Sequence, residues 1–324
     1  MIQLENISKT FRVARREAGL KAAAKALFRK EYTEIKALQN LSFTIGDGEM
    51  VGYIGPNGAG KSSTIKIMSG VMTPDSGSCV INGHVPWKER KEHVREIGVV
   101  FGQRSQLWWD VPVIDSFELL RDIYRVEQQA YGRNLRELTE LLDLGDIVRT
   151  PVRQLSLGQR MRCEIAASLL HDPEILFLDE PTIGLDAVSK IAVRDFIRTV
   201  NREKGTTVIL TTHDMQDIEA LTERILLIGK GQILLDGSLS ALKSRYSTKR
   251  TLTVDYDGNA LGEAEHITVL QDHCGHAKLL IDTAEISVSQ AIAAISAQAE
   301  IRDLSVTGES VEETVVSLYQ EFAI

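Results

Sequence analysis

The stretch GPNGAGKS, residues 55–62, constrains the fold of this chain more than any other feature of its sequence. It fits the pattern G-x-x-x-x-G-K-S, follows an apolar run of strand length and opens a segment that favours a helix. Glycines let backbone N–H groups turn inward around phosphate oxygens. Lys61 would bring a positive charge to the β- and γ-phosphates of a nucleotide, and Ser62 would offer a hydroxyl to magnesium. The predicted nucleotide-binding residues of this loop are Gly55, Pro56, Asn57, Gly58, Ala59, Gly60, Lys61, Ser62 and Ser63.

Two acidic residues stand at the carboxyl end of a second apolar run, EILFLDE. Open α/β sheets bind their ligands at that end of their strands. Asp179 would therefore hold magnesium, directly or through water. Glu180 would orient and polarise the water that attacks the γ-phosphate. The alternative is a solvated acidic turn, and the phosphate loop upstream makes it the weaker interpretation.

Two further polar residues end or follow strands of the same predicted sheet. His213 closes the run TVILTTH, and Gln103 follows IGVVF. By itself, His213 is compatible with a buried, hydrogen-bonded histidine. A strand next to that of Asp179 would instead bring His213 beside the γ-phosphate. Gln103 would be placed to contact magnesium or the attacking water.

Strands and helices alternate along most of the chain, which predicts a mostly parallel sheet of the α/β class. The N-terminal MIQLENISKTF predicts an edge strand, and residues 113–149 and about 187–202 predict helices. From about residue 245 the predicted strands are weaker, and a helix is expected near VSQAIAAISAQ. We expect one nucleotide-binding domain over residues 1–240 and a small accessory α/β domain over 241–324.

Composition excludes several classes of protein. The net charge of −8 argues against a general nucleic-acid binder. Apolar runs of the ~18 residues that span a membrane are absent from the sequence, and the N-terminus lacks a signal-peptide pattern, so we expect a cytoplasmic protein. The cysteines Cys79, Cys163 and Cys274 lie far apart in the sequence and are expected to be buried thiols.

A short polar turn in RQLSLGQRMR, residues 153–162, stands at the start of another predicted helix. Helix N-termini carry free N–H groups and about half a positive charge, so they bind anions. The chain therefore has a second anion-binding turn, at Ser156 and Gly158, far along the sequence from the phosphate loop.

Taken together, the motifs resemble those of ABC transporter ATP-binding subunits. GPNGAGKSS, Gln103, LSLGQ, ILFLDEP, the GLD of residues 184–186 and His213 occur in the order typical of that family, and the resemblance covers residues 1–235. It implies a P-loop NTPase cassette with a mostly parallel core, an antiparallel β subdomain and a helical subdomain at about 104–172. It also implies binding and hydrolysis of ATP with Mg²⁺.

The resemblance assigns roles to individual residues. Phe11 matches the aromatic residue that stacks on adenine. Gln103 matches the glutamine that couples nucleotide state to the membrane partner, and His213 matches the histidine at the γ-phosphate. Asp186 matches the residue that crosses the interface between two subunits. The turn residues Ser156, Gly158 and Gln159 match those that complete the ATP site of the other subunit in a head-to-tail dimer, although Leu157 stands where the family usually has glycine.

The resemblance is strongest to subunits of exporters of drugs, antibiotics, lipids or polysaccharides, whose integral-membrane permeases are separate chains. An importer ATPase and a non-transport ABC ATPase are the alternatives. We expect a homodimer on the cytoplasmic face of the membrane, with permease partners and no nucleic acid. The basic insertion at about 12–36 would contact the membrane or permease, or be a solvated insertion. Trp108 and Trp109 would contact the permease or pack in the helical subdomain.

Overall fold

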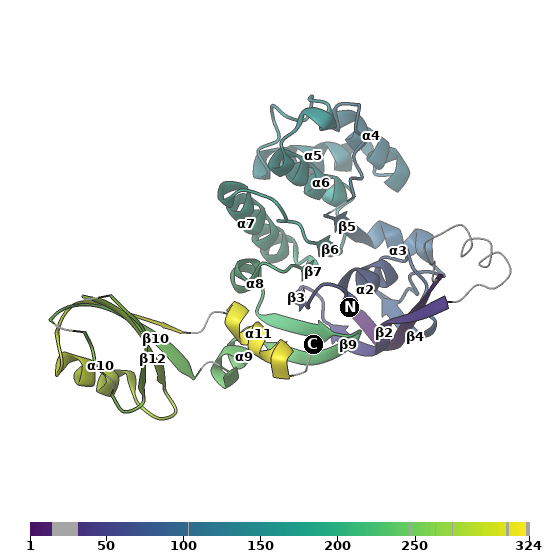
Figure 1. The fold of residues 1–324 in the computed structure, drawn as a ribbon. Helices are drawn as coiled ribbons and strands as arrows, with labels where there is room; N and C mark the ends of the chain where they lie inside the picture. The colour runs from purple at the N-terminus through teal and green to yellow at the C-terminus, as the bar shows by residue number, and fades with distance from the viewer. Residues whose placement is uncertain are drawn as a thin grey trace, which may run out of the picture. The chain divides into compact units, whose positions relative to one another are not determined.

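The computed structural model describes residues 1–14, 32–102, 104–246, 248–258, 260–262, 264–273, 275–308 and 311–321. The chain divides into two units, Met1–Asp236 and Gly237–Ile324, which are described separately (Figure 1). Within the described ranges, every helix is too short or too polar to cross a membrane. Gln103, Cys274 and most of the basic insertion, residues 15–31, lie outside the described residues.

The centre of the first unit is a six-stranded sheet with the order β5-β6-β7-β3-β8-β9. Its strands are β3 (Met50–Ile54), β5 (Ile97–Phe101), β6 (Ile175–Asp179), β7 (Thr207–Thr211), β8 (Arg224–Gly229) and β9 (Gln232–Ser238). Neighbouring strands from β5 to β8 pair in parallel. All of β7 and nearly all of β3 and β6 are buried, as their continuous apolar sequences require for strands covered on both faces. The predicted parallel α/β fold is confirmed.

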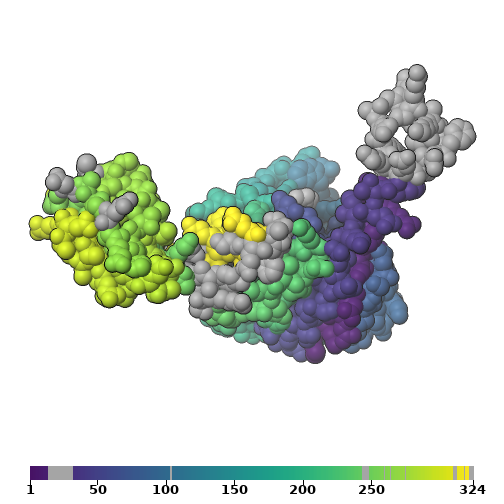
Figure 2. Space-filling view, turned by 60° about the horizontal axis from the view of Figure 1, so that its bottom comes forward, coloured from purple at the N-terminus to yellow at the C-terminus, as the bar shows by residue number. Residues whose placement is uncertain are grey.

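A three-stranded antiparallel sheet with the order β2-β1-β4 lies beside this core, and its first two strands run along one side of the unit in purple in Figure 2. Its strands are β1 (Ile2–Ala14), β2 (Tyr32–Ile45) and β4 (Ser76–Ile81). The prediction that the N-terminal segment is an edge strand was wrong. Ile2 pairs with Ile45 on one side and with Ile81 on the other, so β1 is the central strand.

Helices flank the central sheet and form a separate cluster above it in Figure 1. Those around the sheet are α2 (Lys61–Met68), α3 (Arg90–Glu96), α7 (Ala187–Lys204) and α8 (Met215–Leu221). The cluster consists of α4 (Val113–Tyr124), α5 (Gln128–Leu141), the short 3₁₀ helix η1 (Val152–Gln154) and α6 (Leu157–Leu169). Both α4 and α5 pack on α6.

The second unit is built on a four-stranded antiparallel sheet with the order β11-β12-β10-β13. Its strands are β10 (Lys249–Asp257), β11 (Ile267–Asp272), β12 (His276–Asp282) and β13 (Glu300–Gly308). Alternate residues of β10, Leu252, Val254 and Tyr256, are buried in one apolar cluster with residues of α10 (Val288–Ser296). The helices α9 (Leu239–Tyr246) and α11 (Val311–Glu321) contact each other. This unit therefore has a hydrophobic core of its own.

Candidate functional site

The phosphate loop joins β3 to α2, and close packing fixes its shape. Gly60 precedes the first residue of α2 with φ +113°, a conformation that favours glycine. A Cβ atom there would lie 2.7 Å from the carbonyl oxygen of Ala37 on β2. A Cβ atom on Gly55 would lie 2.4 Å from the carbonyl oxygen of Ile228 on β8. Both ends of the loop are therefore held against neighbouring strands where a side chain would not fit.

Lys61 is the first residue of α2 and is held inside the loop. Its Nζ atom donates hydrogen bonds to the carbonyl oxygens of Gly55, at 2.5 Å, and Pro56, at 3.2 Å. Burial lowers the pKa of Lys61, while the nearby carboxylates of Glu180 and Asp179 act to raise it. The loop thus holds a cation next to two acids.

A cavity of about 440 Å³ opens over the loop. This volume is in the range of small-molecule binding sites. The predicted loop residues from Pro56 to Ser63 all line it, together with Asp179 and Glu180. The other lining residues are Ile35, Lys36, Ala37, Lys66, Phe101, Gly102 and Arg104. Lys66 and Arg104 do not belong to any of the motifs found in the sequence, and their presence at the cavity was not predicted.

Strand register places the two acids. Asp179 is the last residue of β6 and pairs with Thr211, the last residue of β7. The Thr211 hydroxyl donates a 2.6 Å hydrogen bond to Asp179 Oδ1, and the Glu180 N–H donates to the Thr211 carbonyl oxygen at 2.9 Å. Thr211 was missed in the sequence; its place at the end of the neighbouring strand is the signal that marks it. Glu180 itself has φ +56°, so the chain turns sharply after the strand.

His213 follows β7 and reaches the second acid. Its Nδ1 atom lies 3.4 Å from Glu180 Oε1. The His213 side chain is 61% exposed, whereas that of Glu180 is 21% exposed. The buried histidine considered in the sequence is therefore not what the structure contains.

The turn at the start of α6 is well formed and does not line this cavity. The Ser156 hydroxyl accepts a hydrogen bond from the Gln159 N–H, and the Gln159 side chain accepts one from the Ser156 N–H, which together make a capping box. A Cβ atom on Gly158 would lie 2.5 Å from Ser189 Oγ at the start of α7. Ser156, Gly158 and Gln159 are not among the residues that line the cavity.

Gln103, Phe11 and Asp186 complete the set of predicted site residues. Gln103 is outside the described residues, although its neighbours Gly102 and Arg104 line the cavity. Phe11 pairs across the β1–β2 ladder with Ile35, and Ile35 rather than Phe11 lines the cavity. Asp186 caps α7, since its Oδ1 atom accepts a 2.8 Å hydrogen bond from the Ser189 N–H.

The donor set at the cavity suits Mg²⁺ bound together with phosphate. Among the residues that the structure describes, His, Cys, Asp and Glu form no group of three or more that could hold a metal by themselves. Mg²⁺ is usually bound by one or two protein oxygen ligands together with substrate phosphates and water. The Ser62 hydroxyl and the Asp179 carboxylate both line the cavity and fit that requirement.

The fold and this site define a P-loop nucleotide-binding cassette. A family model described as "ABC transporter" matches residues 38–183. The daunorubicin resistance ATP-binding protein DrrA3 of Streptomyces coeruleorubidus is 34% identical over 235 residues, which cover 72% of this chain and 74% of that protein. The ABC transporter ATP-binding protein NatA of Bacillus subtilis is 30% identical over 229 residues, 71% of this chain and 92% of that protein. The chain belongs to the ABC transporter family.

Two further comparisons extend this assignment. The linearmycin resistance ATP-binding protein LnrL of Bacillus subtilis is 28% identical over 291 residues, 88% of this chain and 92% of that protein. The dimeric post-hydrolysis structure of the ATP-binding cassette MJ0796 with ADP and phosphate is similar with a TM-score of 0.62 and 27% identity, over 74% of this chain and 99% of that one. The protein is thus an ABC ATPase that binds ATP with Mg²⁺ and hydrolyses it. Cassettes of this family form dimers and work with membrane permeases.

Proposed function

We propose that this chain is the ATP-hydrolysing subunit of an exporter, acting on the cytoplasmic face of the membrane with a separate permease. The observation that carries the ATPase part is the convergence of Lys61, Asp179 and Glu180 on one cavity, with His213 beside Glu180. Relatives named as resistance ATP-binding proteins support the export direction.

Each residue of the site has a proposed role in hydrolysis. Lys61 and the loop N–H groups neutralise the charge that develops on the phosphates. Ser62 and Asp179 would hold Mg²⁺, which would supply positive charge to stabilise the phosphates when it is bound. Glu180 accepts a proton from the attacking water, and His213 orients that carboxylate and the γ-phosphate. Gln103 is proposed as a further ligand to Mg²⁺ or the water.

Nucleotide binding is proposed to involve a second copy of the chain. Ser156, Gly158 and Gln159 do not line the cavity of their own chain, yet they form the N-terminus of a helix, which attracts anions. Packed head to tail, this turn would bind the γ-phosphate on the partner. ATP would then hold the dimer together, and its hydrolysis would release it. Leu157 is 38% exposed beside the turn.

An exposed aromatic pair is the proposed contact for the permease. Trp108 and Trp109 are 59% and 52% exposed, so the alternative that they pack in the helical core is wrong. The guanidinium of Arg160 lies 5.9 Å from the centre of the Trp109 ring. Large exposed aromatic residues are typical of interface anchors.

Recovery of the chain from detergent-solubilised membranes of its source cells tests the transport assignment. We expect an integral-membrane protein to co-purify with the chain in a fixed ratio. Reconstituted with the ATP sites facing outward, the complex should use ATP to accumulate a fluorescent probe such as daunorubicin inside vesicles. Recovery of the chain without any membrane protein would contradict the assignment, and ATP-driven loss of preloaded probe would indicate an importer.

A further inference from the structure

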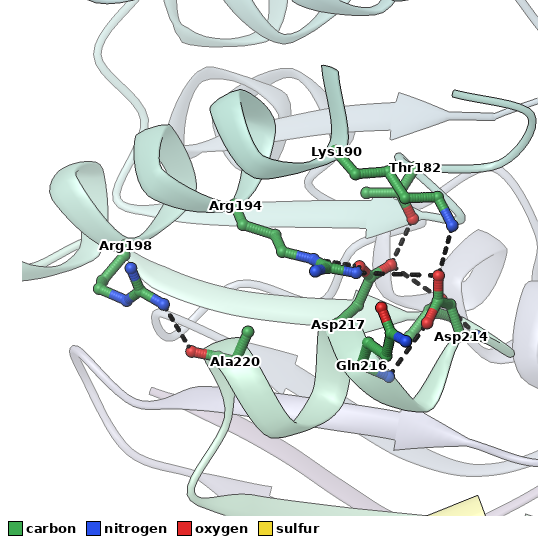
Figure 3. A network of polar contacts seen from close by, with 9 residues as sticks. Thr182, Lys190, Arg194, Arg198, Asp214, Gln216, Asp217 and Ala220 are labelled. Carbon is green, nitrogen blue, oxygen red and sulfur yellow. Dashed lines mark hydrogen bonds and ion pairs between the residues drawn. The ribbon is translucent and has the colours of Figure 1, made fainter. Parts of the chain in front are cut away.

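A network of partly and fully buried polar side chains joins three segments of the first unit, two of which carry Glu180 and His213 (Figure 3). The segments are the turn after Glu180, the turn around His213 with α8, and the helix α7. The network is formed by Thr182, Lys190, Arg194, Thr212, Asp214 and Asp217.

Asp217 is the central residue of this network. Its side chain has no exposed surface. One carboxylate oxygen accepts hydrogen bonds from the hydroxyls of Thr182 and of Thr212, the latter at 3.3 Å. The other oxygen lies 2.5 Å from two nitrogens of Arg194. Thr182 follows Glu180 by two residues, and Thr212 directly precedes His213. The Asp217 carboxylate is therefore hydrogen-bonded to both turns.

Asp214 extends the network on the other side of His213. It pairs with Lys190, and its second oxygen accepts a 3.0 Å hydrogen bond from the Gln216 N–H at the start of α8. Burial acts to raise the pKa of Asp214, but the hydrogen bonds from Lys190 and Gln216 outweigh it and lower that pKa. Both residues next to His213 along the chain are therefore held: Thr212 donates a hydrogen bond to Asp217 on α8, and Asp214 forms an ion pair with Lys190 on α7.

Asp217, at the centre of the network, is buried, whereas one member of the pair that the network supports is exposed. The His213 side chain is largely exposed, and within the described residues its recorded polar contact is the one with Glu180. The position of this pair must then come from the backbone on each side. The fully buried carboxylate of Asp217 is costly unless it is paired, so the network favours the arrangement in which Asp217 keeps its partners.

We propose that Asp217, acting through Thr182, Thr212 and Arg194 and supported by the Asp214–Lys190 ion pair, is a positioning residue that holds Glu180 and His213 in register for hydrolysis. This inference rests on the proposed roles of Glu180 and His213. Loss of one of these contacts would let the Glu180 carboxylate leave its position, although the residue itself is kept. The result is slower chemistry with ATP still bound.

Thr182→Val tests the proposal, because it removes one hydroxyl and keeps the shape of the side chain. In the full-length protein, kcat for ATP should fall by about tenfold to a hundredfold, while KM for ATP changes by less than about twofold. Thr182→Ser restores the hydroxyl and should restore kcat. The matched control is Thr222→Val, a buried threonine directly after α8 whose hydroxyl donates to the Ile218 carbonyl oxygen at 3.0 Å. It should leave kcat unchanged.

A second variant keeps the test decisive if Thr182→Val does not fold. Lys190→Gln breaks the contact with Asp214 at a side chain that is 29% exposed, and circular dichroism checks that the fold is kept. It should also lower kcat more than KM. Wild-type kcat in the folded variants would overturn the proposal. Glu180→Gln distinguishes failure of this inference from failure of the proposed function. If Glu180→Gln is inactive while Thr182→Val and Lys190→Gln are fully active, only the positioning role of Asp217 is wrong. If Glu180→Gln is fully active, the proposed function is wrong.

Discussion

His213 Nδ1 lies 3.4 Å from Glu180 Oε1, although the two residues follow different strands. Their closeness is a consequence of strand register. Residues Asp179 and Thr211 are paired at the ends of the parallel strands β6 and β7, so the residues just beyond these ends lie close to each other, and Glu180 lines the cavity. We propose that the Glu180 carboxylate takes a proton from the attacking water and that the exposed His213 orients it.

Replacing Glu180 by Gln tests this role. The amide keeps the size of the side chain but cannot accept a proton as the carboxylate does. We expect ATP binding to be retained and hydrolysis to fall by about a hundredfold or more. The variant should accumulate as an ATP-bound dimer in gel filtration. Phosphate release at the wild-type rate would remove Glu180 from the catalytic step.

Replacing Gly60 by Ala tests the packing of the phosphate loop. The new methyl group would meet the Ala37 carbonyl oxygen, and the residue would have to keep φ +113°. We expect ATP affinity to fall by about tenfold or more, because a displaced phosphate loop that loses ~1.4 kcal/mol of binding free energy binds ATP tenfold more weakly. Gly205→Ala is the control: φ is +67° there, and the space around a Cβ atom is open to 4 Å. It should cost about 1 kcal/mol of stability and leave ATP affinity unchanged.

The stability of the first unit should fall on acidification because of two histidines, His93, which is buried, and His171, which is partly buried. Burial lowers the pKa of His171 to about 4. The Nε2 atom of His171 lies 2.9 Å from the Ile97 carbonyl oxygen, and its ring stacks on that of Tyr124. Below the unfolded pKa near 6.5, the unfolded chain takes up a proton that the folded chain does not, so the free energy of unfolding falls as pH drops toward 4. His93, with its pKa also lowered by burial, acts in the same direction.

Urea unfolding at pH 7 and pH 5 measures this effect. The wild-type protein should lose about 1 to 2 kcal/mol more than His171→Gln over that interval, since glutamine can keep the hydrogen bond but does not titrate. An equal loss in the two proteins would show that His171 does not take up the proton.

The aromatic pair should affect partner binding and not catalysis. Trp108→Ala with Trp109→Ala should leave the ATPase activity of the isolated protein within about twofold of wild type, because both side chains are exposed and neither lines the cavity. Co-purification with the permease should drop sharply. Undiminished recovery of the permease would place its binding surface elsewhere.

Motif positions on strand ends were predictable from the sequence, because strand–helix alternation and the phosphate loop together fix which ends face the ligand. The central position of β1 was not, since its pairing with β4 joins segments far apart in the chain. Thr211 and Asp217 have no motif, and their roles depend on neighbours brought close only by the fold. The two tryptophans were ambiguous because an aromatic pair next to a predicted helix is compatible with either core or interface.

We propose that the turn at Ser156 acts on the ATP of a second copy, and two inactive variants test this role. Lys61→Ala removes the charge that holds the phosphates. Ser156→Asp keeps a good helix cap but sets a carboxylate at the turn, which would repel a phosphate charge 4 Å away by about 4 kcal/mol at an effective dielectric near 20. Ser287→Asp is the matched control, because Ser287 caps α10 with the same capping box to Gln290. That control should remain fully active.

The decisive measurement is ATP hydrolysis by a mixture of the Lys61→Ala and Ser156→Asp proteins, with the permease present and mixed dimers verified by two affinity tags. In a mixed dimer, one ATP site carries both defects and the other pairs an intact Lys61 with an intact Ser156 turn. The account predicts hydrolysis well above the sum of the two separate variants. If the turn instead served its own chain, every site would carry a defect, and verified mixed dimers without recovered hydrolysis would contradict the account.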